Sequence, residues 1–201
     1  MYKIIALEGG EGSGKGTVIN MLKAAYPQFV FTREPGGSPI AEKIRNVIVD
    51  KENVGMTAVT EAMLYSAARN QVLHDTVIPA LEQGKVVVFD RYYDSFLVYQ
   101  GMARGLGLET AQTMTDIAIE GYETTLTIYL DIEPEKGMAR IAANSNREVN
   151  RLDLESMEFH HKVRAGYLKL AEMFPDRVKI VNADQTPHEV FADVVRLIED
   201  L

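Results

Sequence analysis

A single lysine that closes a run of glycines near the N-terminus is the first residue with evident chemical use. It lies in the nine-residue stretch Gly9-Gly10-Glu11-Gly12-Ser13-Gly14-Lys15-Gly16-Thr17. An apolar run precedes this stretch and a helix-like segment follows it, and strand, glycine-rich loop, lysine and helix in this order form a P-loop. Its backbone N–H groups surround phosphate oxygens, and the lysine adds a positive charge. We therefore predict that every residue of the stretch except Glu11 binds a nucleotide; the alternative is a glycine-rich loop without a ligand.

Two residues could hold a divalent cation beside those phosphates. Gly16 stands where Ser or Thr usually coordinates Mg²⁺, so Thr17, the next residue, is the candidate ligand, with helix capping as its alternative role. Asp90 ends the apolar run 86–89, a position from which a carboxylate commonly orients the Mg²⁺ shell in P-loop proteins. Its alternative role is also that of a helix cap. The sequence thus predicts a metal site at Thr17 and Asp90.

Arginines indicate a second phosphate site. Arg91 follows Asp90 directly, and a planar guanidinium can bind two phosphate oxygens at once. Arg33, Arg45 and Arg69 fall on or near the same side of the expected sheet. A nucleotide hydrolase needs one phosphate cradle, whereas a kinase that phosphorylates a phosphate needs two. The arginines therefore favour such a kinase over a binding protein without turnover.

Composition narrows the class of protein. The 201 residues carry 21 Lys and Arg against 29 Asp and Glu, a net charge of −8, which argues against a nucleic-acid partner. The chain has no cysteine, which excludes disulfides and thiolate metal sites. A strand begins almost at once and no apolar run approaches the roughly 20 residues of a membrane span, so we expect no membrane association and a cytoplasmic location.

Strands and helices alternate along the whole chain. Strands are expected at 4–7, 29–32, 86–89, 126–131 and 178–181. Helices are expected at 17–25, 40–50, 57–83 (bent or divided at Pro79), 94–103 and 109–121, from 134, up to about 174, and from 187. This alternation predicts a single three-layer α/β domain, 1–201, with a mostly parallel five-stranded sheet. Because ligands bind at the carboxyl ends of such strands, the P-loop, the loop 33–37 and Asp90-Arg91 should converge on one edge.

Two longer stretches carry a family resemblance. Thr32-Arg33-Glu34-Pro35-Gly36-Gly37 and the twelve residues 90–101, DRYYDSFLVYQG, resemble the signature stretches of thymidylate kinases. With the P-loop and Asn150-Arg151-Leu152-Asp153, the similarity spans nearly the whole chain in the right order. The resemblance implies a P-loop nucleoside-monophosphate-kinase fold, a homodimer, and transfer of the γ-phosphoryl group of ATP to dTMP with Mg²⁺, which gives dTDP.

The resemblance also implies roles for residues at matching positions. Glu11 would approach the acceptor sugar and the metal, and a cis Glu34-Pro35 bond would shape the floor of the acceptor-phosphate site. Other acceptor contacts would be Arg45 (phosphate), Tyr65 (stacked on thymine), Arg69 (base edge), Ser95 and Gln100 (base), and Tyr99 (crowding the sugar 2′ position). From the pattern alone, an aromatic at the position of Tyr65 is more often a core residue, and Ser95 could simply cap the helix that follows.

A lid is expected at about residues 142–153. The P-loop contains Gly12-Ser13 and no arginine, and family members of this kind take a catalytic cation from the lid. Arg147 and Arg151 are the candidates, and a solvated charged loop is the alternative. The predicted catalytic set is Lys15, Arg91, Glu11, Arg147 and Arg151.

Substrate choice stays open between two readings. Gly14-Lys15-Gly16-Thr17 is more like adenylate kinases than most thymidylate kinases, and Val98 replaces the usual alanine of the second signature. A nucleoside-monophosphate kinase of broader specificity is therefore the alternative to a kinase selective for dTMP.

The lid assignment gives a first testable prediction. Arg147→Ala or Arg151→Ala should lower kcat by at least about tenfold, or about 1.4 kcal/mol, because the migrating phosphoryl group loses a neutralising cation. Steady-state kinetics of both single variants and the double variant would measure this. Unchanged kcat in all three would exclude the lid from the mechanism.

Overall fold

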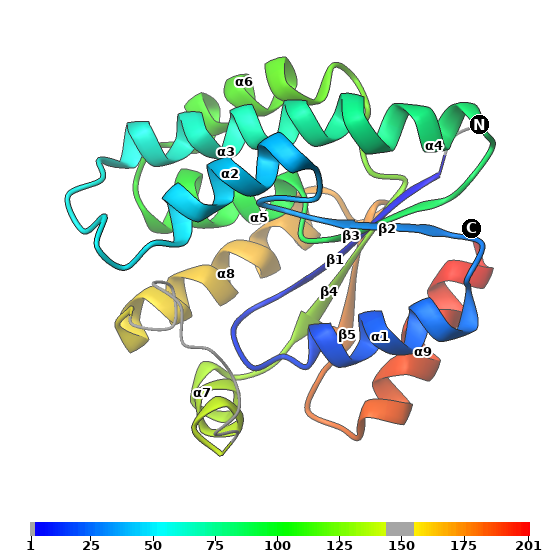
Figure 1. Cartoon of the computed structure of the whole chain (residues 1–201). Coiled ribbons are helices and arrows are strands. Elements are labelled where there is room, and N and C mark those ends of the chain that lie inside the picture. The colour runs from blue at the N-terminus through cyan, green and yellow to red at the C-terminus, as the bar shows by residue number, and fades with distance from the viewer. Residues whose placement is uncertain (1–2, 144–154) are drawn as a thin grey trace.

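Five parallel strands form the centre of the molecule. A computed structural model describes residues 3–143 and 155–201. Its strands are β1 (Ile4–Gly9), β2 (Val30–Arg33), β3 (Val87–Asp90), β4 (Leu126–Asp131) and β5 (Val178–Asn182), in the order β2-β3-β1-β4-β5 (Figure 1). Every residue of β1 is buried, as expected for the central strand of a sheet covered on both faces.

Helices cover both faces of this sheet. One face carries α1 (Lys15–Ala25) and α9 (Pro187–Glu199). The other carries α2 (Pro39–Val49), α3 (Ala58–Val72), α5 (Tyr93–Phe96), α6 (Leu108–Ile119) and α8 (Met157–Met173) (Figure 1). The helix α7 (Pro134–Ala142) follows β4 in the chain. The expected three-layer α/β architecture is confirmed, and all four strand pairs are parallel.

The predicted helices differ from the observed ones in two places. The expected helix over 57–83 is divided by a π-helical turn, η1 (Leu73–Val77), after which α4 (Ile78–Glu82) begins with Pro79 in its first turn. The expected helix over 94–103 changes from α to π geometry at η2 (Leu97–Ala103). Hydrophobic periodicity does not report which carbonyl each N–H reaches, so it could not distinguish these π segments from an α-helix.

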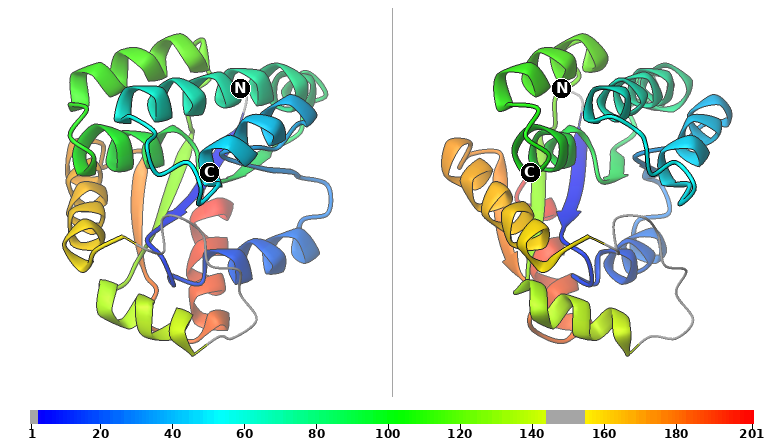
Figure 2. Two further views of the ribbon diagram at one scale, coloured as in Figure 1. Left: turned by 60° about the vertical axis from the view of Figure 1, so that its left-hand side comes forward. Right: turned by 90° about the vertical axis from the view of Figure 1, so that its left-hand side faces the viewer.

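The strand register brings the predicted polar clusters together. Asp90 pairs with Leu7 of β1 on one side and with Arg33 of β2 on the other, so three strands end at the same edge. The P-loop, the loop after β2 and Arg91 leave the sheet from this edge. The helix α7 lies beside the P-loop turn in both views of Figure 2.

The described helices show no candidate for a membrane span. None of those within residues 3–143 and 155–201 is long and apolar enough to cross a membrane.

Candidate active site

The P-loop is shaped by two glycines and by the start of α1. Gly12 and Gly14 have φ values of 72° and 83°, in the left-handed region that favours glycine. Gly14 is the N-cap of α1 and supplies no side-chain hydrogen bond, so the helix N-terminus is left for a ligand. An anion at this point would meet backbone N–H groups and the positive end of the helix dipole.

A large cavity opens along the P-loop. It has a volume of about 740 Å³, within the range of roughly 300–1,000 Å³ usual for small-molecule sites. Every P-loop residue from Gly10 to Thr17 lines it. Its far end is bounded by Arg140 and Ile141 of α7 and by Ala183 and Val190 near α9. We call this space the donor cavity.

A second cavity lies on the other side of Arg91. It measures about 210 Å³, and we call it the acceptor cavity. All nine residues predicted from the resemblance to contact the acceptor line it: Glu34, Pro35, Arg45, Tyr65, Arg69, Arg91, Ser95, Tyr99 and Gln100. They come from the loop after β2, from α2 and α3, and from the segment after β3. The two cavities share four lining residues, Glu11, Lys15, Asp90 and Arg91.

Opposite charges are paired at this junction. Lys15 Nζ forms an ion pair with Asp90, and Arg91 Nη2 lies 3.0 Å from Glu11 Oε1. Burial would raise the pKa of Asp90, but the charge and hydrogen bond of Lys15 outweigh burial and lower it. Asp90 is therefore ionised at neutral pH, and its carboxylate is available to a cation.

Arg91 has an unusual backbone. Its φ of 65° is one of two positive values among the described non-glycine residues. Such a conformation costs on the order of 1–3 kcal/mol and persists only where the surroundings enforce it. The guanidinium carbon lies 5.1 Å from the centre of the Tyr99 ring, so the side chain is held against an aromatic face.

A buried ion pair forms one wall of the acceptor cavity. Arg69 is fully buried and reaches both carboxylate oxygens of Glu34 at 3.0–3.1 Å. Burial raises the pKa of Glu34, and the neighbouring guanidinium opposes that shift. Arg69 Nη1 is buried and has no hydrogen-bond partner among the described residues. The Glu34-Pro35 peptide bond is cis, as predicted.

The remaining acceptor residues have defined partners. Arg45 Nη1 donates to the Pro35 carbonyl at 3.0 Å, and Gln100 Nε2 donates to Glu61 Oε1 at 2.9 Å. The Tyr65 ring lies 6.3 Å from that of Phe96 and is half-buried. The Ser95 hydroxyl is directed to Glu8 and Tyr167 at the back of the cavity. The contact of Ser95 with the base, which the family resemblance implies, stays a prediction.

The carboxylate and hydroxyl oxygens suit a hard cation. Asp90, Glu11 and Thr17 all line the donor cavity. Within residues 3–143 and 155–201, no group of three or more His, Cys, Asp or Glu side chains could hold a metal by itself. Mg²⁺ is commonly bound by one or two carboxylates together with phosphate oxygens, so this donor set fits Mg²⁺.

Some residues around the site were not singled out from the sequence. Glu8 is buried behind Arg91, and Tyr167 of α8 donates a hydrogen bond to Glu8. Arg140 borders the donor cavity. Only Glu8 had a sequence signal, since a carboxylate inside an apolar strand requires a buried partner. The lid candidates Arg147 and Arg151 lie outside the described residues.

Gly137 is another such residue, and it holds α7 against the P-loop. A Cβ on Gly137 would lie 2.3 Å from the Glu11 carbonyl oxygen, and one on Gly12 would lie 2.0 Å from the Gly137 carbonyl oxygen. Real Cβ atoms essentially never approach so closely. The two backbones are therefore in direct contact, and α7 packs closely against the P-loop.

A P-loop joined to a second, arginine-rich cavity defines a P-loop kinase that acts on nucleoside monophosphates. The family model for thymidylate kinase matches residues 7–194. The chain is 53% identical to a thymidylate kinase of Clostridium novyi, covering 94% of this chain and 95% of that one. It is 52% identical to a thymidylate kinase of Anoxybacillus flavithermus, covering 100% and 98%. A crystal structure of thymidylate kinase from Ehrlichia chaffeensis is similar with a TM-score of 0.78 at 25% identity over 98% of both chains. The chain belongs to the thymidylate kinase family.

Contact between Gly137 and the P-loop gives a second testable prediction. Gly137→Ala should lower kcat/KM for ATP by about tenfold or more, because the new methyl group displaces either α7 or Glu11. Alanine favours a helix, so thermal unfolding should not report a large loss of stability.

Gly55→Ala is the matched control, since a Cβ there meets nothing within 4 Å. Wild-type kcat/KM for ATP in Gly137→Ala would show that the P-loop does not depend on this contact.

Proposed function

We propose that this member of the thymidylate kinase family transfers the γ-phosphoryl group of ATP to dTMP and so forms dTDP. One observation carries the proposal: two cavities, one along a P-loop and one lined by arginines, meet at Glu11, Lys15, Asp90 and Arg91. A phosphoryl group passing between two nucleotides must cross such a junction. Transfer of this kind depends on positioning and on neutralising charge, which these residues can provide.

ATP would occupy the donor cavity. Its phosphates would bind the backbone of Gly10 and of Gly12 to Thr17, and Lys15 would exchange Asp90 for the β- and γ-phosphates. Gly9, also predicted to bind ATP, is the buried last residue of β1 and is not among the residues that line the donor cavity. The adenine base would lie at the far end, where Ile141, Ala183 and Val190 offer apolar contact and Arg140 a guanidinium.

The dTMP molecule would occupy the acceptor cavity. Its phosphate would bind Arg45 and Arg91, and its base would stack on Tyr65 near Gln100. The unpaired Nη1 of Arg69 supports a contact with the base, because a buried donor without a partner is costly unless a ligand satisfies it. The buried Tyr99 ring, which lines this cavity, would crowd the sugar 2′ position and favour deoxyribose.

Mg²⁺ would bind at Asp90 and Thr17, with Glu11 nearby. When bound, such an ion neutralises charge on the β- and γ-phosphates. The chain's own contribution is to hold the two phosphates in line, through Arg91 from the acceptor side and Lys15 from the donor side. Arg147 and Arg151 are proposed to add positive charge from the lid.

Substrate dependence tests this function and gives a third prediction. Protein with Mg-ATP should release ADP only slowly, and added dTMP should stimulate release strongly. We expect kcat/KM for dTMP to exceed that for dUMP by roughly 10–200-fold, the effect of one methyl group in a fitted pocket. The kcat/KM for AMP and for dGMP should be lower still than that for dUMP, because both carry a purine base in place of a pyrimidine.

Lys15→Met is the matched loss-of-function control in the same assay. ADP release that dTMP does not stimulate would overturn the proposed function. Comparable kcat/KM for dTMP, dGMP and AMP would favour the broader monophosphate kinase.

A homodimer is proposed from the outer face of α3 and α6. Val59, Met63 and Ile117 are 50%, 60% and 73% exposed, although they are apolar, and α3 packs beside α6. Such a face favours contact with a second copy of the chain. The proposed cytoplasmic location rests on the sequence, in which no apolar run approaches the roughly 20 residues of a membrane span.

Light scattering checks the dimer and gives a fourth prediction. The protein should have about twice its monomer mass of 22.4 kDa at micromolar concentration. Met63→Glu should shift it toward monomer, because the new carboxylate would be desolvated in the interface. Ile180→Glu, at an exposed apolar residue on β5, is the control and should leave the mass unchanged. A wild-type monomer would contradict the proposal.

A further inference from the structure

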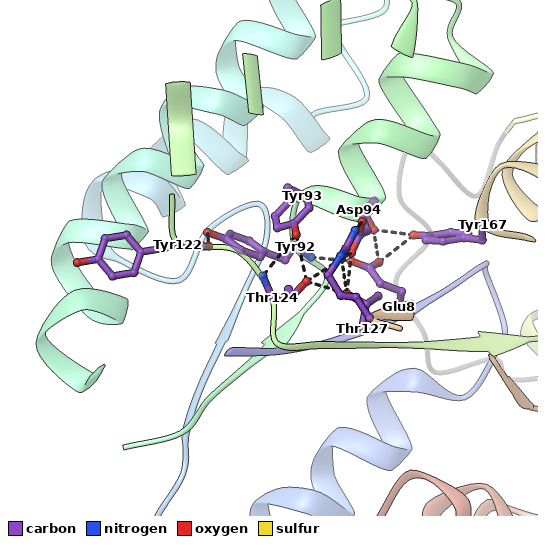
Figure 3. A network of polar contacts seen from close by, with 10 residues as sticks. Glu8, Tyr92, Tyr93, Asp94, Tyr122, Thr124, Thr127 and Tyr167 are labelled. Atoms are coloured by element: carbon purple, nitrogen blue, oxygen red, sulfur yellow. Dashed lines mark hydrogen bonds and ion pairs between the residues drawn. The ribbon is translucent and has the colours of Figure 1, made fainter. Parts of the chain in front are cut away.

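Glu8 is a fully buried carboxylate on β1, directly before the P-loop. Its Oε1 accepts a hydrogen bond from the Tyr92 backbone N–H at 2.8 Å. Its Oε2 accepts from two hydroxyls, those of Ser95 at 2.5 Å and Tyr167 at 2.8 Å. In Figure 3 the side chains of Glu8 and Tyr167 point toward one another across the space between β1 and α8. A carboxylate buried in this way needs a counter-charge within reach.

That counter-charge is Arg91. Its Nη1 donates to the same two hydroxyls, at 3.3 Å to Ser95 and 3.4 Å to Tyr167. Each hydroxyl thus donates its proton to Glu8 and offers a lone pair to Arg91. Burial raises the pKa of Glu8, and the positive charge of Arg91 opposes this shift.

We propose that Glu8 is a positioning residue for Arg91: through the hydroxyls of Ser95 and Tyr167 it fixes the guanidinium where the donor and acceptor cavities meet. This inference rests on the proposed function and assigns a task to groups that need not touch either substrate. We call Glu8 and the Ser95 and Tyr167 hydroxyls the brace. The brace contacts Nη1 of Arg91, whereas Nη2 faces Glu11 and is the nitrogen that a phosphate would bind. An arginine side chain has several rotatable bonds, and holding one nitrogen before substrates bind reduces the ordering that the reaction would otherwise require.

A purely structural role for Glu8 makes different predictions. If Glu8 only satisfied the Tyr92 N–H and joined β1 to the segment after β3, its replacement would lower stability and leave turnover unchanged. A positioning role and a packing role of Glu8 are therefore distinguished by whether the effect of a Glu8 substitution on kcat depends on Arg91.

Two variants test the brace from its two sides and give the fifth prediction. Glu8→Gln keeps the shape and an acceptor for Tyr92 but removes the charge, and Tyr167→Phe removes one hydroxyl. Both should lower kcat for dTMP phosphorylation, by about ten- to a hundredfold for Glu8→Gln and a few-fold for Tyr167→Phe. KM for ATP should change little, because the P-loop backbone is untouched.

Tyr93→Phe is the matched control. It removes the hydroxyl of another buried tyrosine, which bonds Thr124 and not Arg91. Its kcat should be that of the wild type. Thermal unfolding of every variant would separate loss of fold from loss of turnover.

A double-mutant cycle with Arg91→Ala decides the mechanism. In that background, Glu8→Gln and Tyr167→Phe should lower kcat by less than twofold further, because the group they position is gone. The proposal would be overturned if the effects of the substitutions on kcat were fully additive with that of Arg91→Ala, or if both single variants kept wild-type kcat. If Glu8→Gln does not fold, Tyr167→Phe carries the test. Failure of the wild type to phosphorylate dTMP would instead reject the proposed function.

Discussion

Three cations that line the cleft, Lys15, Arg91 and Arg69, are each paired with a carboxylate, and the charge balance of the site depends on this pairing. Lys15 pairs with Asp90, Arg91 with Glu11, and Arg69 with Glu34. An acidic chain can gather cations for two nucleotide phosphates only if their charges are balanced while the site is empty, because a buried unpaired charge is far costlier than a paired one. In the proposed function, phosphate oxygens would replace Asp90 beside Lys15 and Glu11 beside Arg91. Neither cation would then be buried without a partner.

Fold and site differ in how far the sequence predicts them. Alternating apolar runs and helical periods were enough for the parallel sheet, and the glycines around Lys15 were enough for the P-loop, since both follow from local patterns. Contacts between distant backbones, such as that of Gly137 with Glu11, leave no such pattern. The sequence indicates that Glu8 needs a buried partner but does not identify that partner, because Ser95 and Tyr167 come from α5 and α8, which only the tertiary structure brings to β1.

The π-helical segment η2 is the clearest case of a local pattern giving an incomplete answer. Its residues 97–103 have the periodicity of a buried helix, and they are helical, but with the wider i→i+5 hydrogen bonding. Tyr99 and Gln100 both lie in it, one against Arg91 and the other lining the acceptor cavity. Since π turns are concentrated at functional sites, it is consistent that this departure from regular geometry falls where two neighbouring side chains both line the acceptor cavity.

The helices α7 and α8 connect the active site to the segment that the family resemblance assigns to the lid. Gly137 of α7 contacts the P-loop, and Tyr167 of α8 contacts Glu8 and Arg91. These helices are the described elements on either side of residues 144–154 in the chain. The P-loop and Arg91 are therefore each in contact with a helix that borders this segment in the chain. A change in the position of α7 would therefore reach the P-loop backbone through Gly137, whereas one in α8 would reach Arg91 through the Tyr167 hydroxyl, so the two helices act on the junction of the cavities through separate contacts.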